Sequence, residues 1–140
     1  MSTIKADNIA TLAGVSTSMA NAVNGSAKAW VNFDGTFGTS PFTVANGGIR
    51  RAFNVSSITD NGTGDYTVNF TTAMVDADYG INVLGCPATT TTDAGSVLNA
   101  KATMAMSAPA SDSLRIRAGY NYYTASAFAD WPFVFVSIFS

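Results

Sequence analysis

The sequence predicts an all-β protein, an antiparallel β-sandwich, and three observations support that prediction. Apolar and polar residues alternate with a period of two in several short segments, which is typical of half-buried strands. Turn-forming Gly, Pro, Asn and Asp separate these segments. All nine acidic residues are Asp, and the chain has no Glu and no Gln. Because these helix formers are missing while Thr, Val, Phe and Tyr are common, the composition favours strands and turns.

The 140 residues suit one folded domain, residues 27–140, preceded by an N-terminal segment, residues 1–26. Charged residues make up only 11 % of the chain, so little charge protects its surface from self-association. The net charge is −2 and the basic residues are scattered, which argues against nucleic acid as a partner. No apolar run approaches the ~20 residues that cross a bilayer, so we expect no membrane insertion.

The N-terminal segment, residues 1–26, has two conformations open to it. Its apolar residues fit a weak helical stripe with Asp7 or Asn8 as N-cap. The members of that stripe are Ile4, Ile9, Leu12 and Val15. So short a helix is not stable alone in water and needs a partner. We therefore predict a docking segment, extended or a short helix, with a disordered leader as the alternative.

The first strand of the domain is predicted at Ala27–Phe33, where Ala27, Ala29, Val31 and Phe33 share a face. Residues 36–48 are predicted to form a loop from which two phenylalanines pack back onto the sheet. These are Phe37 and Phe42. One face of the next strand is expected to contain Ile49, Arg51, Phe53 and Val55.

The clearest strand pair is a hairpin within Asn54–Thr71, around which we expect the other strands to stack. Its second strand places Tyr66, Val68 and Phe70 on one face. Between the strands, Asp60–Asp65 is the predicted loop. Asn-Gly tolerates positive φ, and the further glycine makes the loop longer than a two-residue turn and compatible with a bulge.

Three further segments, together with the last strand, complete about seven to nine predicted strands. Tyr79, Ile81 and Val83 share a face of one strand, Val97–Met106 is another, and Ser113–Tyr120 alternates clearly. Residues 121–123 and 127–128 are placed in or beside a loop.

The last strand, Pro132–Phe139, is apolar on both faces except at Ser137, so both faces must be buried. One face can meet the core, but no helix is predicted after residue 26 to cover the other. We therefore expect a subunit interface at this strand. Its candidate residues are Phe133, Phe135, Ile138 and Phe139.

Catalytic chemistry has little support. The chain has no histidine, which removes Ser-His-Asp and Cys-His arrangements and His-based zinc sites. Without Glu, a glycosidase would need two Asp residues, and Asp76 and Asp78 fit a turn better. The oxygens of Asp60–Asp65 could hold Ca²⁺, but plain turn chemistry explains them. The single cysteine, Cys86, cannot form an internal disulfide and is read as a small buried hydrophobe. We predict no enzyme, no cofactor and no metal site.

One aromatic cluster suits binding, because aromatic faces near loops stack on sugars or anchor proteins. The cluster comprises Tyr120, Tyr122, Tyr123, Phe128 and Trp131, with Asn121 and Asp130 beside it. The candidate receptor contacts are Tyr120, Asn121, Tyr122, Tyr123 and Trp131. The alternative is that these aromatic residues fill the core and the subunit interface.

The residues from Ala27 to Thr36, then Ile49–Arg50, then Phe53–Phe70 resemble a module recurrent in tail fibre and related tail proteins of tailed bacteriophages, especially those of aquatic bacteria. The opening Ser2–Ile9 also resembles their N-termini. The resemblance covers about half of the chain. Residues 36–48 are longer than the brief Gly-rich link usual in the module, and nothing beyond Ala77 follows a known motif, which leaves the receptor undetermined.

The resemblance implies a virion structural protein, a homotrimer made in the host cytoplasm. It implies fixation to other virion proteins through the N-terminal segment, with β-structure displayed outward. Contact with a host cell-surface glycan or protein is a further expected role. The alternative is an architectural capsid or tail cement or decoration protein with no receptor role. A free carbohydrate-binding or hydrolytic domain is the third hypothesis.

Overall fold

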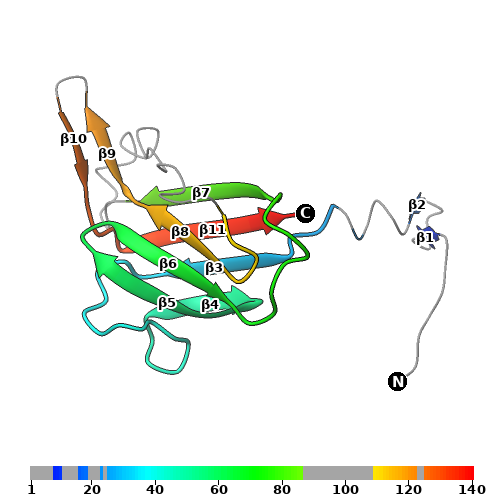
Figure 1. Cartoon of the computed structure of the whole chain (residues 1–140), viewed down its shortest axis with the longest axis horizontal. Coiled ribbons are helices and arrows are strands. Elements are labelled where there is room, and N and C mark those ends of the chain that lie inside the picture. The colour runs from blue at the N-terminus through cyan, green and yellow to red at the C-terminus, as the bar shows by residue number, and fades with distance from the viewer. Residues whose placement is uncertain (1–7, 11–15, 19–22, 24, 87–108, 123–124) are drawn as a thin grey trace.

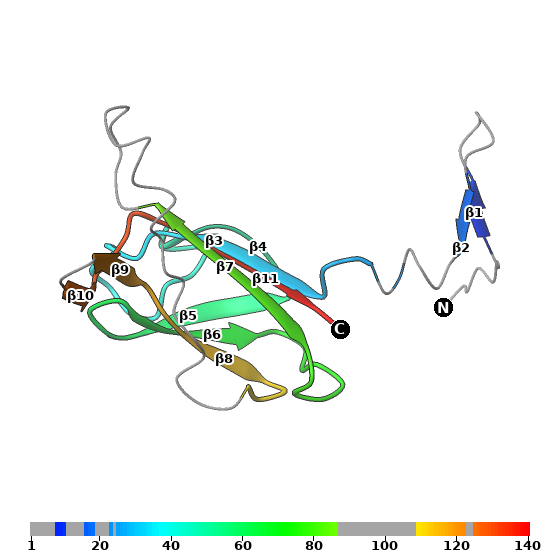
Figure 2. The same cartoon turned by 90° about the horizontal axis from the view of Figure 1, so that it is seen from above.

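The computed structural model describes residues 8–10, 16–18, 23, 25–86, 109–122 and 125–140. Two antiparallel sheets pack face to face (Figure 2), which confirms the prediction of an all-β sandwich. The four-stranded sheet has the order β4 (Ile49–Phe53), β3 (Ala29–Phe33), β11 (Phe133–Phe139), β7 (Gly80–Cys86). The three-stranded sheet has the order β5 (Val55–Gly62), β6 (Asp65–Phe70), β8 (Ser113–Arg117).

Two hairpins stand outside these sheets. β1 (Asn8–Ala10) pairs with β2 (Ser16–Ser18), and β9 (Gly119–Tyr122) pairs with β10 (Ala125–Phe128). Figure 1 shows β9 and β10 at the end of the sandwich opposite the one where the chain terminates. Residues 121–122 and 127–128, which were expected in or beside a loop, lie in these two strands, beside the short connection between them.

Residues 8–10 and 16–18 of the N-terminal segment are extended. Ile9 lies opposite Thr17 in the hairpin of β1 and β2, so the helical stripe is wrong at Ile9, as is Asn8 in the role of N-cap. The other stripe residues lie outside the described part of the chain. These are Ile4, Leu12 and Val15. The predicted strand Val97–Met106 lies outside it too.

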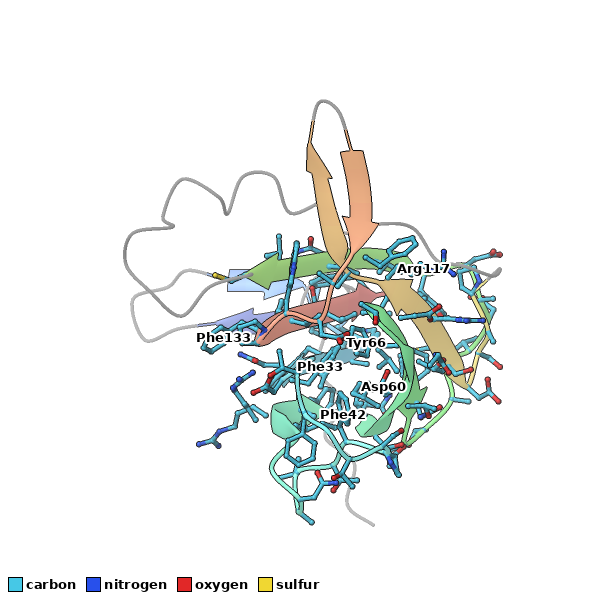
Figure 3. The ribbon with its side chains drawn as sticks, turned by 90° about the vertical axis from the view of Figure 1, so that its left-hand side faces the viewer. Phe33, Phe42, Asp60, Tyr66, Arg117 and Phe133 are labelled. Atoms are coloured by element: carbon cyan, nitrogen blue, oxygen red, sulfur yellow. The ribbon has the colours of Figure 1, made fainter. Side chains whose placement is uncertain are left out.

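The core lies between the two sheets, and the predicted alternation accounts for the residues that β3 and β6 contribute to it. The inward side chains of β3, β6 and β11 are all buried. They are Ala29, Val31, Phe33, Tyr66, Val68, Phe70, Val134, Val136 and Ile138. The rings of Phe33 and Tyr66 meet edge to face with centroids 5.1 Å apart (Figure 3), and Phe42 lies 6.2 Å from both. Phe42 and Phe37 pack back from their loop as predicted, with ring centroids 5.6 Å apart.

The central hairpin is confirmed, but its connection is tighter than the sequence suggested. Gly62 pairs with Asp65, so only Thr63 and Gly64 join the strands, and the register shifts by a bulge between Asp60 and Gly62. Gly64 has φ 62°, and a β-carbon there would lie 2.3 Å from the Ala118 carbonyl oxygen. The predicted six-residue loop is wrong because the bulge admits Asn61 into a continuing strand.

The shared face predicted for residues 49–55 is also wrong. Asn54 has φ 53° and carries the chain from one sheet to the other, so Val55 is 8 % exposed in the second sheet while Phe53 is 54 % exposed on the first. A second bulge, opposite Asn32 and Phe33, turns Arg51 outward although Ile49 faces the core. Along β7, Val83 packs against the core, while Ile81 near the strand end remains 38 % exposed.

Candidate functional site

The outer face of the four-stranded sheet carries six large apolar side chains among polar ones. Ladder pairing places Asn32 and Leu84 on either side of Phe135, and Trp30 and Asn82 on either side of Ser137. These side chains therefore project from the same side of the sheet. We call the hydrophobic residues there the apolar face: Trp30, Phe53, Leu84, Phe133, Phe135 and Phe139. Four of them are strongly exposed, namely Phe53 54 %, Leu84 56 %, Phe133 40 % and Phe139 41 %.

The last strand thus divides as expected into one core face and one outer face. Phe133 and Phe139 are exposed, and Phe135 is partly buried beside them. Ile138 was predicted to join the subunit interface, and this is wrong. Its side chain is 0 % exposed and belongs to the core, because it alternates with Phe139 across the sheet.

A shallow hollow of about 190 Å³ lies on this face, lined mainly by β7 and β11. Arg50 stands at its edge, with the guanidinium carbon 4.4 Å from the centre of the Phe133 ring. The Arg50 Nη2 also donates to Asp34 Oδ2 at 3.0 Å, so the cation is held in place. The hollow therefore offers an apolar floor beside one fixed positive charge, a shape that admits an apolar side chain of another chain.

The outer face of the three-stranded sheet is polar, and its groups bond to one another. We call this array the polar ladder. Asn69 Nδ2 donates to Ser57 Oγ at 3.1 Å and to Thr59 Oγ1 at 3.0 Å. Asn61 Nδ2 donates to Thr67 Oγ1 at 2.9 Å.

Two arginines complete the polar ladder around one carboxylate. Arg115 donates to both oxygens of Asp65, at 2.8 and 2.9 Å, and Arg117 Nε donates at 3.2 Å. The hydrogen bond from Arg115 is the main reason why the pKa of Asp65 is lowered, against the opposing effect of burial. Figure 3 shows Arg117 and Phe133 on opposite sides of the sandwich. The polar groups of the Arg117 face therefore bond to one another, whereas the Phe133 face exposes large apolar side chains.

In Asp60–Asp65, the segment considered as a Ca²⁺ site, both carboxylates accept hydrogen bonds from other groups of the protein. Asp60 Oδ1 accepts from the Gly62 amide at 2.9 Å, and Asp65 is held by the two arginines. In the part of the chain that the structure describes, no three His, Cys, Asp or Glu side chains form a group that could hold a metal. Cys86 is partly rather than fully buried.

The aromatic cluster predicted to contact a receptor divides in space. Trp131 is 3 % exposed and belongs to the core, so its assignment as a surface contact is wrong. Tyr120, Asn121 and Tyr122 lie on β9, and Tyr123 lies outside the described residues. Phe128 is 46 % exposed beneath the Arg117 guanidinium, whose carbon is 4.4 Å from the ring centre.

Asp130 has a structural role that the sequence did not reveal. Its Oδ1 accepts from the Gly64 amide and from the Tyr66 hydroxyl, each at 2.7 Å, and the Tyr66 hydroxyl also lies 2.9 Å from the Gly35 carbonyl oxygen. Burial, followed by the bond to Asp130, raises the pKa of Tyr66. Tyr66 and Asp130 are 64 residues apart along the chain, so no local sequence pattern predicts their hydrogen bond.

A scan against protein-family models and searches of curated proteins and of solved structures gave no match for this chain. Among the described residues there is no helix long and apolar enough to traverse a membrane.

Proposed function

We propose that this chain is a non-enzymatic structural protein of a bacteriophage particle, a tail fibre or tail-tip component assembled from several copies. The observation that supports this most directly is the apolar face, on which Phe53, Leu84 and Phe133 are all at least 40 % exposed. Large exposed apolar patches mark interaction sites, and contact with sister chains would remove this one from water. A trimer is the assembly that the resemblance to phage tail proteins implies.

The arrangement of the chain ends supports attachment through residues 1–26. The chain enters the sandwich at Lys28, whose amide donates to the Ile138 carbonyl oxygen at 2.7 Å, so entry and C-terminus share one end of the domain. The hairpin of β9 and β10 lies at the opposite end (Figure 1). If the N-terminal segment binds other virion proteins, this hairpin points away from the particle. Tyr120, Asn121 and Tyr122 of this hairpin, and Tyr123, which follows them in the sequence, remain our candidates for contact with a host glycan or protein.

The chemistry of the side chains supports a role without catalysis. The chain has no histidine and no glutamate. Three aspartates form structural bonds instead: Asp34 with Arg50, Asp65 with Arg115 and Arg117, and Asp130 with Tyr66. Side chains held by such bonds are not free to approach a substrate.

Gold labelling of particles with antibodies against the purified chain tests this function. We expect label on the tail of the phage that encodes the chain, and loss of label when residues 1–26 are deleted from a chain whose sandwich still folds. Label spread over the capsid would favour the cement or decoration role instead. Particles that carry no label would contradict both roles.

A further inference from the structure

Four strands form the edges of the two sheets, and three of them are protected from pairing with another chain. β4 carries Arg50 and Arg51 and a bulge, and β8 carries Arg115 and Arg117. β5 is covered by Phe42, whose backbone exchanges hydrogen bonds of 2.8 and 2.9 Å with Ile58. Charges, bulges and covering segments are the means by which proteins prevent edge-to-edge association.

Within the described ranges, none of these protections is found at the fourth edge, β7. Its sequence Gly-Ile-Asn-Val-Leu-Gly-Cys contains no charge and no proline, and it pairs with β11 over all seven residues without a bulge. Among the described strands, none pairs with its other side. Ile81 and Leu84 are 38 % and 56 % exposed. A long, regular, uncharged edge of this kind is a template for an added strand.

We propose that β7 pairs antiparallel with β7 of a second copy, about a twofold axis at Val83. A second copy suits this edge because self-pairing places no like charges opposite one another. In the register that uses the whole strand, Val83 faces Val83, Asn82 faces Leu84 and Ile81 faces Gly85 of the other copy. Ile81, Val83 and Gly85 are paired with inward residues of β11. In this register, the inner faces of the two sheets therefore lie on the same side of the joined sheet. Two four-stranded sheets thereby become one continuous sheet.

The edge contact is distinct from the face contact of the proposed function. It uses backbone groups at the rim of the sheet, whereas the face contact uses side chains such as Phe133 and Phe139. Because the edge contact is twofold, it yields an even number of copies, whatever the order of the face contact.

A charge-pairing experiment tests the register. The double variant Asn82→Lys/Leu84→Lys places lysine opposite lysine in both cross-strand pairs, and Asn82→Lys/Leu84→Glu places lysine opposite glutamate. Both variants remove the same leucine from the apolar face, so they differ only in charge. We expect sedimentation equilibrium to show association at least tenfold weaker for the first variant than for the second. Equal association of the two would overturn the proposal. Val44→Lys, at a site 61 % exposed outside β7, controls for added charge.

Hydrogen exchange separates this proposal from the face contact. In the unmodified protein, we expect residues 81–85 to gain amide protection as the concentration rises, with an even number of copies. An odd-numbered oligomer whose β7 edge amides exchange freely would overturn edge pairing and leave the face contact intact. A dimer that survives Phe133→Lys but is lost in the lysine–lysine variant would support edge pairing and contradict the face contact.

Discussion

The indole ring of Trp131 lies directly against the backbone of Gly85, so closely that a β-carbon at residue 85 would be 2.1 Å from the indole Cε3. This contact fastens the end of β7 to the segment that leads into β11. It also explains why Trp131 is buried although loop residues surround it in the sequence. The absence of a side chain at residue 85 is therefore a packing requirement.

Gly85→Ala should destabilise the fold by roughly 1–3 kcal/mol, because the rigid indole must shift to admit the methyl group. Gly80→Ala is the matched control on the same strand, since the nearest atom to its β-carbon would be 3.7 Å away. Urea unfolding of the two variants measures the difference. Equal stabilities would show that Trp131 does not press on Gly85 in solution.

The bond between Tyr66 and Asp130 should be measurable as a coupling energy. Tyr66→Phe leaves the Gly35 carbonyl oxygen without its phenol partner, and we expect a loss of about 1–2 kcal/mol. A double-mutant cycle with Asp130→Ala isolates the pair. Additive losses would mean that the two side chains do not interact.

Tyr66 also predicts a dependence of stability on alkaline pH. Because the pKa of Tyr66 is raised above its ordinary 10.0 in the folded chain, its neutral form is favoured there. The stability that this provides is present below pH 10 and is lost as pH rises beyond it. Tyr66→Phe should lose less stability than the unmodified protein between pH 9 and 11, as followed by urea midpoints. An identical alkaline loss would contradict this role.

Asp65 predicts the opposite dependence at acid pH. Its pKa is lowered below the ordinary 3.8, chiefly by Arg115, so the stability it provides is present above that pH and is lost as pH falls further. Asp65→Asn should lower the urea midpoint at pH 7 and flatten the acid limb below about pH 4. Arg115→Gln should act in the same direction. An acid limb as steep as that of the unmodified protein would exclude Asp65 as its source.

The two faces of β11 should respond differently to substitution. Ile138→Ala opens a cavity in the core and should cost about 2–5 kcal/mol of folding free energy. Phe139→Ser changes a side chain that is 41 % exposed, so we expect less than about 1 kcal/mol in the monomer but weaker association. Urea unfolding and sedimentation velocity together separate the effects. Unchanged association of Phe139→Ser would remove this residue from the interface.

Local patterns in the sequence were sufficient where the chain is regular. Alternation in β3, β6 and β8 identified the core faces, and the turn residues after Thr59 located the central hairpin. The assignment of Ile138 to the interface was wrong because the whole last strand is apolar, so its pattern does not say which face is buried. The corner at Asn54 was missed because an asparagine at positive φ leaves little trace in a strand-like sequence.

Contacts between segments that are distant in the sequence could not be predicted from local patterns. Asp65 and Arg115 are 50 residues apart, and Tyr66 and Asp130 are 64 apart. Trp131 is buried against Gly85 of β7, and no periodicity in the sequence predicts this contact. The apolar face was anticipated from the final strand, but its contributions from Trp30, Phe53 and Leu84 emerge only when the sheet order is known.

The size of the protein in dilute buffer tests the central claim most directly. If sister chains cover the apolar face, light scattering of the purified protein at micromolar concentration should report a multiple of the 14.5 kDa chain mass. A single species of 14.5 kDa that stays soluble across that range would contradict the assembly on which the proposed function depends.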